Sequence, residues 1–189
     1  MKILVLDDNP IHRELAEIQL AADHDLTVVG SYDEARDLLD PNYFGQKVCG
    51  ETSPKVDYDV VMVDLLLPAS GKEQGNSSLV GQEMPLGIFL GLLAMVHPRI
   101  KNVAVFTDSD HHEHPASACF DAFSAHETDP LPLKVGEGQL FLVNNRNWIS
   151  HYHQDNLHAK WTDFSGPLPL EVVPGKSWIS VLDYMLNYA

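Results

Sequence analysis

Three aspartates stand at positions where a divalent cation could be bound. Asp7 and Asp8 follow the apolar run at residues 3–6, and Asp64 follows the apolar run at residues 60–63. Parallel strands all end along one rim of a sheet, where open α/β folds place their sites, so the carboxylates are predicted to gather there. Clustered carboxylates repel one another unless a cation lies among them, and their hard oxygen ligands point to Mg²⁺. Thr107 ends a third apolar run, at residues 103–106, and is predicted at the same rim.

The rest of the chain alternates between strand and helix patterns. Short apolar runs predict strands at residues 3–6, 26–29, 60–63, 103–106 and 170–173. Capped or amphipathic stretches predict helices at residues 11–22, 32–39, 85–97, 115–125 and 177–187. Residues 41–57 and 69–83 show no period and contain many Gly, Pro and polar residues, which predicts two long loops. These elements amount to five strand–helix units of an α/β domain.

A β-hairpin is predicted between the fourth and the last of these strands. Residues 131–135 and 139–143 flank the turn sequence Gly136-Glu137-Gly138. The hairpin would form part of an insertion at about residues 128–169. The whole chain, residues 1–189, is predicted to be one domain that carries this insertion.

Composition narrows the class of protein. The net charge of −15, with 12 scattered Lys and Arg residues, disfavours contact with a nucleic-acid backbone. The apolar stretch at residues 84–96 is too short to cross a bilayer, so no membrane contact is expected. The chain starts directly in a strand without a secretory signal pattern, so a cytoplasmic location is expected. Cys49 and Cys119 lack metal-type spacing and are expected to be reduced thiols.

Three segments together resemble the receiver domain of bacterial two-component response regulators. They are L-V-L-D-D-N-P-I-H-R-E-L at residues 4–15, Y-D-V-V-M-V-D-L-L-L-P at residues 58–68 and V-A-V-F-T at residues 103–107. The resemblance implies a flavodoxin-like, doubly wound sheet of five parallel strands in the order 2-1-3-4-5, with the hairpin insertion before the last strand. It also implies a stand-alone phosphoacceptor in phosphorelay signal transduction, rather than an enzyme, whose output is protein–protein contact.

The resemblance also assigns roles to residues. Asp64 would accept a phosphoryl group from a phosphohistidine on a histidine kinase or phosphotransfer protein. Asp7, Asp8, Asp64 and the backbone carbonyl of Leu66 would hold Mg²⁺, which offsets the repulsion between the carboxylate and the phosphoryl oxygens. Thr107 would hydrogen-bond the arriving phosphoryl oxygen.

A receiver also needs a lysine at the end of its fifth strand. Lys176 is the first choice, because it precedes a well-formed terminal helix, although it follows Pro-Gly where the family pattern has Lys before Pro. Lys134 is the alternative.

Two other functions compete with this interpretation. The chain could be a receiver-like binding module with a vestigial site, in which the hairpin and His-rich insertion contact a downstream protein. It could also be a metal-dependent phosphoesterase built on the three aspartates and Asp110-His111-His112, although the upstream His-x-x-x-Asp-x-Asp pattern of such enzymes is missing. The His-rich loop at residues 108–114 and the set His151, His153 and His158 are weaker metal-site candidates, since histidines in polar loops are common without a metal.

Overall fold

A mixed α/β architecture with a largely parallel central sheet confirms the predicted class. The structure, a computed structural model, describes residues 1–40, 56–70, 78–109, 114–125, 129–144, 146–163 and 165–188. The central sheet has six strands in the order β2-β1-β3-β6-β10-β9. Their bounds are β1 Lys2–Leu6, β2 Asp25–Val29, β3 Val60–Asp64, β6 Asn102–Phe106, β9 Leu133–Val135 and β10 Gly138–Val143. The first five strands in that order are mutually parallel, and β9 pairs antiparallel with β10.

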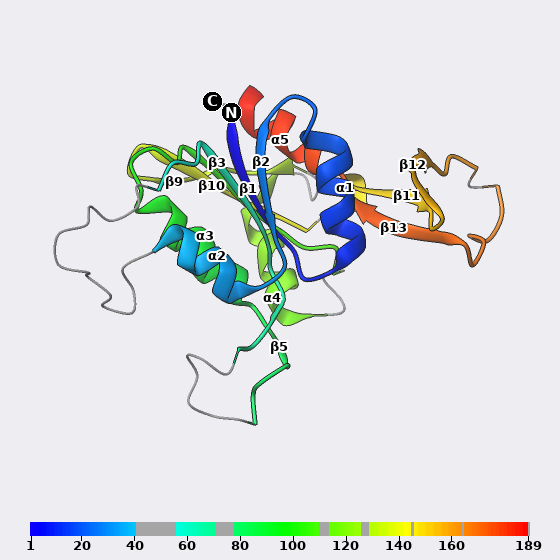
Figure 1. Cartoon of the computed structure of the whole chain (residues 1–189), viewed down its shortest axis with the longest axis horizontal. Helices are drawn as coiled ribbons and strands as arrows, with labels where there is room; N and C mark the ends of the chain where they lie inside the picture. Colours follow the sequence, from blue (N-terminus) through cyan, green and yellow to red (C-terminus); the bar gives the residue numbers. More distant parts are fainter. Residues whose placement is uncertain are drawn as a thin grey trace.

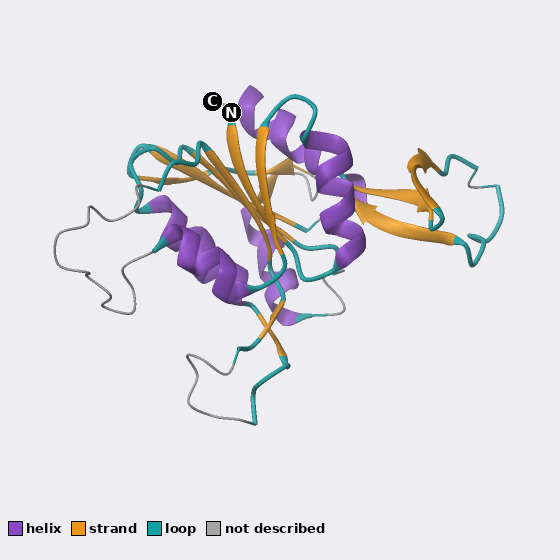
Figure 2. Cartoon of the chain, in the orientation of Figure 1, coloured by secondary structure: helices purple, strands orange, loops and turns teal. Residues whose placement is uncertain are grey.

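Helices cover both faces of this sheet (Figures 1 and 2). Helices α1 Pro10–Leu20 and α5 Trp178–Asn187 pack on one face, and α2 Tyr32–Leu39 and α3 Leu86–Met95 pack on the other. The strands supply both cores because successive side chains point to opposite faces: Leu4 and Leu6 face α2 and α3, whereas Ile3 and Val5 face α1 and α5. This two-sided burial explains the continuous apolar runs of the central strands.

Side-chain caps fix two of the helix starts. The Asn9 side chain accepts a hydrogen bond from the backbone N–H of Ile11, and Pro10 occupies the first turn of α1. The Ser31 hydroxyl oxygen accepts from the N–H of Glu34, and the Glu34 carboxylate accepts from the Gly30 N–H and the Ser31 hydroxyl, a reciprocal arrangement related to the capping box.

The predicted β-hairpin is present, but its second strand has a different role from the expected one. This strand is β10 Gly138–Val143, which contains the predicted residues 139–143 and starts one residue earlier. It is the fifth parallel strand of the central sheet and lies next to β6. All six of its residues are buried, as a strand covered on both faces requires. The hairpin therefore belongs to the central sheet and is not an addition before the last strand.

The strand predicted at residues 170–173 lies outside the central sheet, which corrects the prediction. It is β13 Val172–Lys176, and it pairs antiparallel with β11 Ile149–His153, which also pairs with β12 Asn156–Lys160. We call this second sheet, of order β12-β11-β13, the β-arm; it projects away from the main sheet beside α1 (Figure 1). Pro174 and Gly175 explain the position of β13 at an edge, because proline has no N–H to donate to a ladder and glycine weakens a strand interior.

Several short elements lie outside the central sheet, the β-arm and the four longer helices. They are β4 Leu67–Pro68 paired with β5 Glu83–Met84, β7 Ser124–Ala125 paired with β8 Asp129–Pro130, α4 Pro115–Ala118, and the 3-10 turns η1 Cys119–Phe123 and η2 Arg146–Trp148. The helix predicted at residues 115–125 is thus one α-helical turn followed by a 3-10 turn. Cys49 and most of the predicted loop at residues 41–57 lie outside the described residues, as do residues 71–77 of the loop predicted at 69–83. Across the described ranges, no helix is both long enough and apolar enough to cross a membrane.

Candidate functional site

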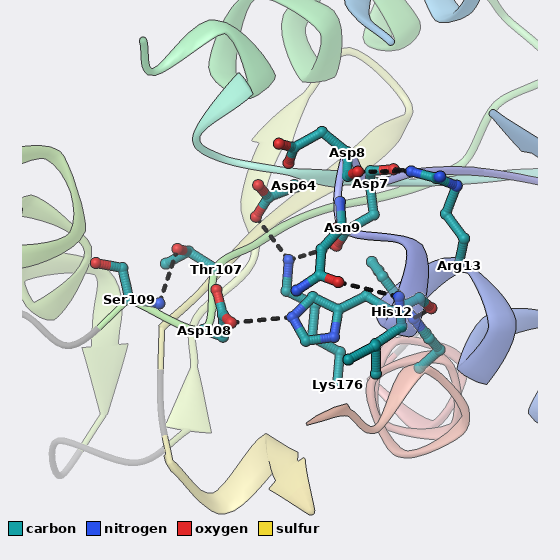
Figure 3. Close-up of polar contacts among 12 residues, drawn as sticks. Asp7, Asp8, Asn9, His12, Arg13, Asp64, Thr107, Asp108, Ser109 and Lys176 are labelled. Atoms are coloured by element: carbon teal, nitrogen blue, oxygen red, sulfur yellow. Dashed lines mark hydrogen bonds and ion pairs between the residues drawn. The ribbon is translucent and has the colours of Figure 1, made fainter. Parts of the chain in front are cut away.

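The structure brings the three predicted aspartates together at the C-terminal rim of the central sheet. Strands β1 and β3 are parallel neighbours with Leu6 opposite Val63, so the residues that follow them meet. Asp7, Asp8 and Asp64 each offer a carboxylate oxygen, and these oxygens all lie within 4.8 Å of one another. Asp7 is 1% and Asp64 is 5% exposed, whereas Asp8 is half-buried. Two of the three carboxyl groups are therefore removed from solvent. Figure 3 shows the three side chains near one another at this rim.

Lys176 supplies the positive charge of this cluster. Its side chain is 0% exposed, and its Nζ donates to Asp64 Oδ1 at 2.6 Å and to Asp7 Oδ2 at 2.7 Å. The ammonium also lies 5.4 Å from the ring centroids of Phe106 and Trp178, a cation–π distance. Lys134, the alternative candidate, is exposed on β9 opposite Gln139. Lys176 is thus the lysine that reaches Asp64.

The pKa values in the cluster reflect burial and mutual charge. Burial raises the pKa of Asp64 to about 7, and the Lys176 ammonium acts in the opposite direction. Burial, and secondly the charge of Asp7, raise the pKa of Asp8. Burial alone would lower the pKa of Lys176, but the carboxylates of Asp64, Asp7 and Asp108 together raise it above its ordinary value. Lys176 is therefore a permanent cation at neutral pH, and the three aspartates carry more negative charge than it can neutralise.

A cavity of about 500 Å³ opens directly onto the carboxylates. Thr107 and Leu66, both predicted site residues, line it together with Asp7, Asp8 and Asp64. The Thr107 Oγ1 accepts a hydrogen bond from the backbone N–H of Ser109 at 3.1 Å, which leaves its hydroxyl hydrogen to be donated. A small polyatomic anion would fit this space. The cavity is lined by all the predicted site residues except Lys176, which lies behind the carboxylates of Asp7 and Asp64.

The backbone of the Asp7-Asp8 turn is held from both sides. Asp7 Oδ1 accepts from the N–H of Asn9 at 2.9 Å. The guanidinium of Arg13 donates to the carbonyl oxygens of Asp7 and Asp8 at 2.8 and 2.7 Å. Gly30 leaves room for this guanidinium, since a Cβ there would lie 3.1 Å from an Arg13 nitrogen. The positions of the two carboxylates are therefore set by α1 and by the end of β2, and not by the strand alone.

Sequence reasoning missed a histidine–carboxylate pair at the same cavity. His12 is 2% exposed, and its Nε2 lies 2.9 Å from Asp108 Oδ2. This hydrogen bond is the main cause that lowers the pKa of Asp108 to about 2, so Asp108 is ionised at neutral pH and the imidazole N–H donates to it. The other ring nitrogen, Nδ1, is buried and has no partner in the described part of the chain. The sequence feature that could have predicted this pair is a histidine four residues after Asp8, on the buried face of a helix.

One of the other predicted histidine sites lies mostly outside the described residues, and within them the other has no cluster of metal-ligating groups around it. Asp110, His111 and His112, on which the phosphoesterase alternative depends, lie outside the described residues, as does most of the loop at 108–114. His151, His153 and His158 are on the β-arm, and in the ranges that the structure describes only Asp7, Asp8 and Asp64 form a cluster of metal-ligating groups.

The donor set fits a hard divalent cation. Its side-chain ligands are carboxylate oxygens only, the arrangement that Mg²⁺ and Ca²⁺ prefer over Zn²⁺ or Cu²⁺. The carboxylate of Asp8 carries no hydrogen bond from Lys176 and lines the cavity, so it is the oxygen donor most open to an ion.

Comparison with known proteins adds little. No family model matches the sequence, and no curated protein matches it. Among solved structures, two chains of the RcsB response regulator of Salmonella typhimurium are similar, with 19% and 21% sequence identity and TM-scores of 0.34 and 0.33. The matches cover 59% and 58% of this chain, but only 44% and 42% of the RcsB chains.

Proposed function

We propose that this chain is a receiver-like signalling domain in which Asp64 accepts a phosphoryl group in the presence of Mg²⁺. The observation that carries the proposal is the buried Lys176 ammonium, which bonds both Asp64 and Asp7 at the floor of a cavity lined by Asp8 and Thr107. A lysine fixed against the accepting carboxylate is suited to receive the charge of an incoming phosphoryl group. Ionisable groups with perturbed pKa values that gather at a cavity are typical of functional sites.

The proposed step is an in-line displacement. One Asp64 carboxylate oxygen forms a bond to phosphorus while the phosphorus–nitrogen bond of the donor phosphohistidine breaks, and the departing imidazole takes up a proton. Lys176 loses part of its bond to Asp64 and binds a phosphoryl oxygen instead, and Thr107 donates its hydroxyl hydrogen to another. Asp64 must be ionised to attack, and Lys176 favours that form.

Asp7, Asp8, Asp64 and the Leu66 carbonyl would hold the Mg²⁺ ion. When bound, the ion neutralises charge on the carboxylates and on the phosphoryl oxygens, so that the two anions can approach. Lys176 by itself leaves the cluster negative, so the transfer requires the ion.

The partners follow from this chemistry. The donor would be a histidine kinase or a phosphotransfer protein, and the output would be a changed contact with a downstream protein, in the cytoplasm. The net charge of −15 makes direct contact of this chain with nucleic acid unfavourable.

Incubation with acetyl phosphate and Mg²⁺, followed by intact-mass measurement, tests the proposal. We expect a base-labile mass gain of one phosphoryl group that Asp64→Asn abolishes. Asp183→Asn, the same change at an exposed position on α5, is the matched control and should retain the mass gain. Chelation of Mg²⁺ should also abolish it.

The binding-module alternative predicts a different result. No mass gain in the wild-type protein at any Mg²⁺ concentration, together with partner binding that is insensitive to Asp64→Asn, would replace the proposed function by a receiver-like scaffold.

A further inference from the structure

The lysine of the site comes from the β-arm and not from the central sheet. β10 occupies the fifth parallel position, and its C-terminal end leads to Asn144. Lys176 ends β13, whose partner is β11, with Lys176 opposite Ile149. No strand of the central sheet therefore fixes the backbone of Lys176, and something else must hold it to the accuracy that an ion pair of 2.6 Å requires.

The backbone around Lys176 is held by α1 and by the base of the β-arm. The Gln19 side-chain amide donates to the Lys176 carbonyl oxygen at 3.1 Å and to the Tyr152 hydroxyl at 3.3 Å. The Gln19 Oε1 accepts from the N–H of Ile179, in the first turn of α5, at 3.1 Å. One side chain of α1 thus joins the end of β13, the strand β11 and the start of α5.

Other contacts near Lys176 also join α1 to the base of the β-arm. A Cβ at Gly175 would overlap with Leu15 of α1 and would lie 3.0 Å from the Tyr152 ring, so β13 is packed closely against both. The N–H of Ser177 donates to the Trp148 carbonyl at 2.8 Å, and the Trp178 indole donates to the His12 carbonyl at 2.8 Å. Every contact in this series comes from α1 or from the segment that carries the β-arm.

We propose that Gln19 is a positioning residue for Lys176, acting with Tyr152, and that the base of the β-arm is thereby part of the site. This inference rests on the proposed function, because it explains how the phosphoacceptor is given its lysine. Gln19 touches neither Asp64 nor the cavity, so its effect passes through the backbone of Lys176.

The test uses two variants of Gln19 and one control. Gln19→Met keeps the length of the side chain and removes all three hydrogen bonds, and Gln19→Glu keeps the acceptor for Ile179 but removes the donor to Lys176. Gln154→Met, the same change at an exposed position in the turn of the β-arm, is the matched control. If Gln19→Met fails to fold, the nearly isosteric Gln19→Glu decides the question.

Two readouts are measured on each protein with the full chain. The first is the resonance of the Lys176 side-chain methylene next to the ammonium, in protein with isotope-labelled lysine, assigned by its loss in Lys176→Arg. The second is the rate of phosphorylation by acetyl phosphate at saturating Mg²⁺, with Mg²⁺ affinity measured separately. We expect both Gln19 variants to shift the resonance and to slow phosphorylation on the order of tenfold, with Mg²⁺ affinity retained.

The possible outcomes separate this inference from the proposed function. Equal rates and an unmoved Lys176 resonance in both Gln19 variants, relative to Gln154→Met, would overturn the inference. A loss of Mg²⁺ affinity in parallel with the rate would also overturn it, because a general disturbance of the carboxylates would then explain the effect. If the wild-type protein accepts no phosphoryl group, the proposed function falls, and the Lys176 resonance alone decides whether Gln19 positions the lysine.

Discussion

The ionisation of Asp64 controls whether it can act as a nucleophile. Burial raises the pKa of Asp64 to about 7, so the protonated form dominates below that pH and the carboxylate above it. About a tenth of the molecules would carry the carboxylate one pH unit below the pKa. At low Mg²⁺, the phosphorylation rate should therefore rise about tenfold between pH 6 and pH 8. Saturating Mg²⁺ should move the midpoint to lower pH, because the cation favours the ionised form.

Rates with a small phosphodonor across this pH range, at two Mg²⁺ concentrations, check the prediction. A flat profile at low Mg²⁺ would mean that Lys176 already keeps Asp64 ionised throughout. A midpoint that does not respond to Mg²⁺ would mean that the cation does not contact this carboxylate.

The hydrogen bond between His12 and Asp108 should make the free energy of unfolding depend on pH in the acid range. The hydrogen bond from His12 is the first cause that lowers the pKa of Asp108 to about 2. A lowered carboxylate pKa adds stability that is present above the ordinary value of 3.8 and is lost as the pH falls through about 2. Asp108→Asn should therefore lower the free energy of unfolding by on the order of 1 kcal/mol at pH 7, a value that allows for the partial exposure of Asp108. The loss should become smaller as the pH approaches 2.

Urea denaturation of both proteins at pH 7, 5 and 3 measures the difference. A difference in the free energy of unfolding that stays constant with pH would show that the carboxylate charge is not what His12 stabilises.

At the scale of elements, the approach of α3 to β3 depends on a glycine. A Cβ at Gly87 would overlap with the backbone carbonyl oxygen of Asp64, and the Gly87 N–H donates to the Leu65 carbonyl at 3.1 Å. Backbone atoms cannot move aside as a flexible side chain can. Gly87→Ala is therefore expected to destabilise the protein by about 3 kcal/mol or more, despite the better helix propensity of alanine.

Thermal denaturation measures this effect. A loss of about 3 kcal/mol corresponds to a fall in Tm of roughly 6–12 °C for a chain of this size. Gly166→Ala is the control, since a Cβ there has nothing within 4 Å. Equal Tm values for the two variants would contradict the close approach of α3 to the end of β3.

At the scale of the whole molecule, stability should depend on a divalent cation. The chain carries a net charge of −15, and three of its carboxylates lie around one buried ammonium. A cation that binds only the folded state stabilises it by about 1.4 kcal/mol at ten times its Kd, or roughly 3–6 °C in Tm. Mg²⁺ should raise the Tm by this amount, whereas NaCl at the same ionic strength should not.

Asp8→Asn should abolish the Mg²⁺ effect and raise the stability of the metal-free protein. Burial and the charge of Asp7 raise the pKa of Asp8, so its ionised form is disfavoured in the folded state. A raised carboxylate pKa means that stability is lost as the pH rises from 3.8 through the raised pKa, and it is not regained at higher pH. Removal of this charge should therefore increase the Tm at pH 8 without Mg²⁺. A lower Tm, or an undiminished response to Mg²⁺, would place the cation elsewhere.

Much of the fold could be predicted because the signals are local. The apolar runs of β1, β3 and β6 are long enough to be strands and lack polar residues, so each must be covered on both faces. Parallel strands in one layer then place Asp7, Asp64 and Thr107 at a common rim. The turn at Gly136 predicted the β9–β10 hairpin in the same way, and the glycine has a φ of +61°.

The fifth strand could not be predicted because two segments compete for one place beside β6. Residues 139–143 and residues 172–176 are both short and partly apolar. Only packing decides between them: β10 buries every residue, whereas β13 carries Pro174 and can serve at an edge. The pairing of His12 with Asp108 was missed for a related reason, since 96 residues separate them.

The order of residue types along the chain was enough to determine the α/β class, the strand ends and the acidic character of the rim, because hydrophobic period and turn chemistry act over a few residues. The choice of Lys176 over Lys134 was decided only in the tertiary structure. That choice depends on α1, β11 and the start of α5 meeting at Gln19, and contacts between segments more than 130 residues apart leave no periodic trace in the sequence.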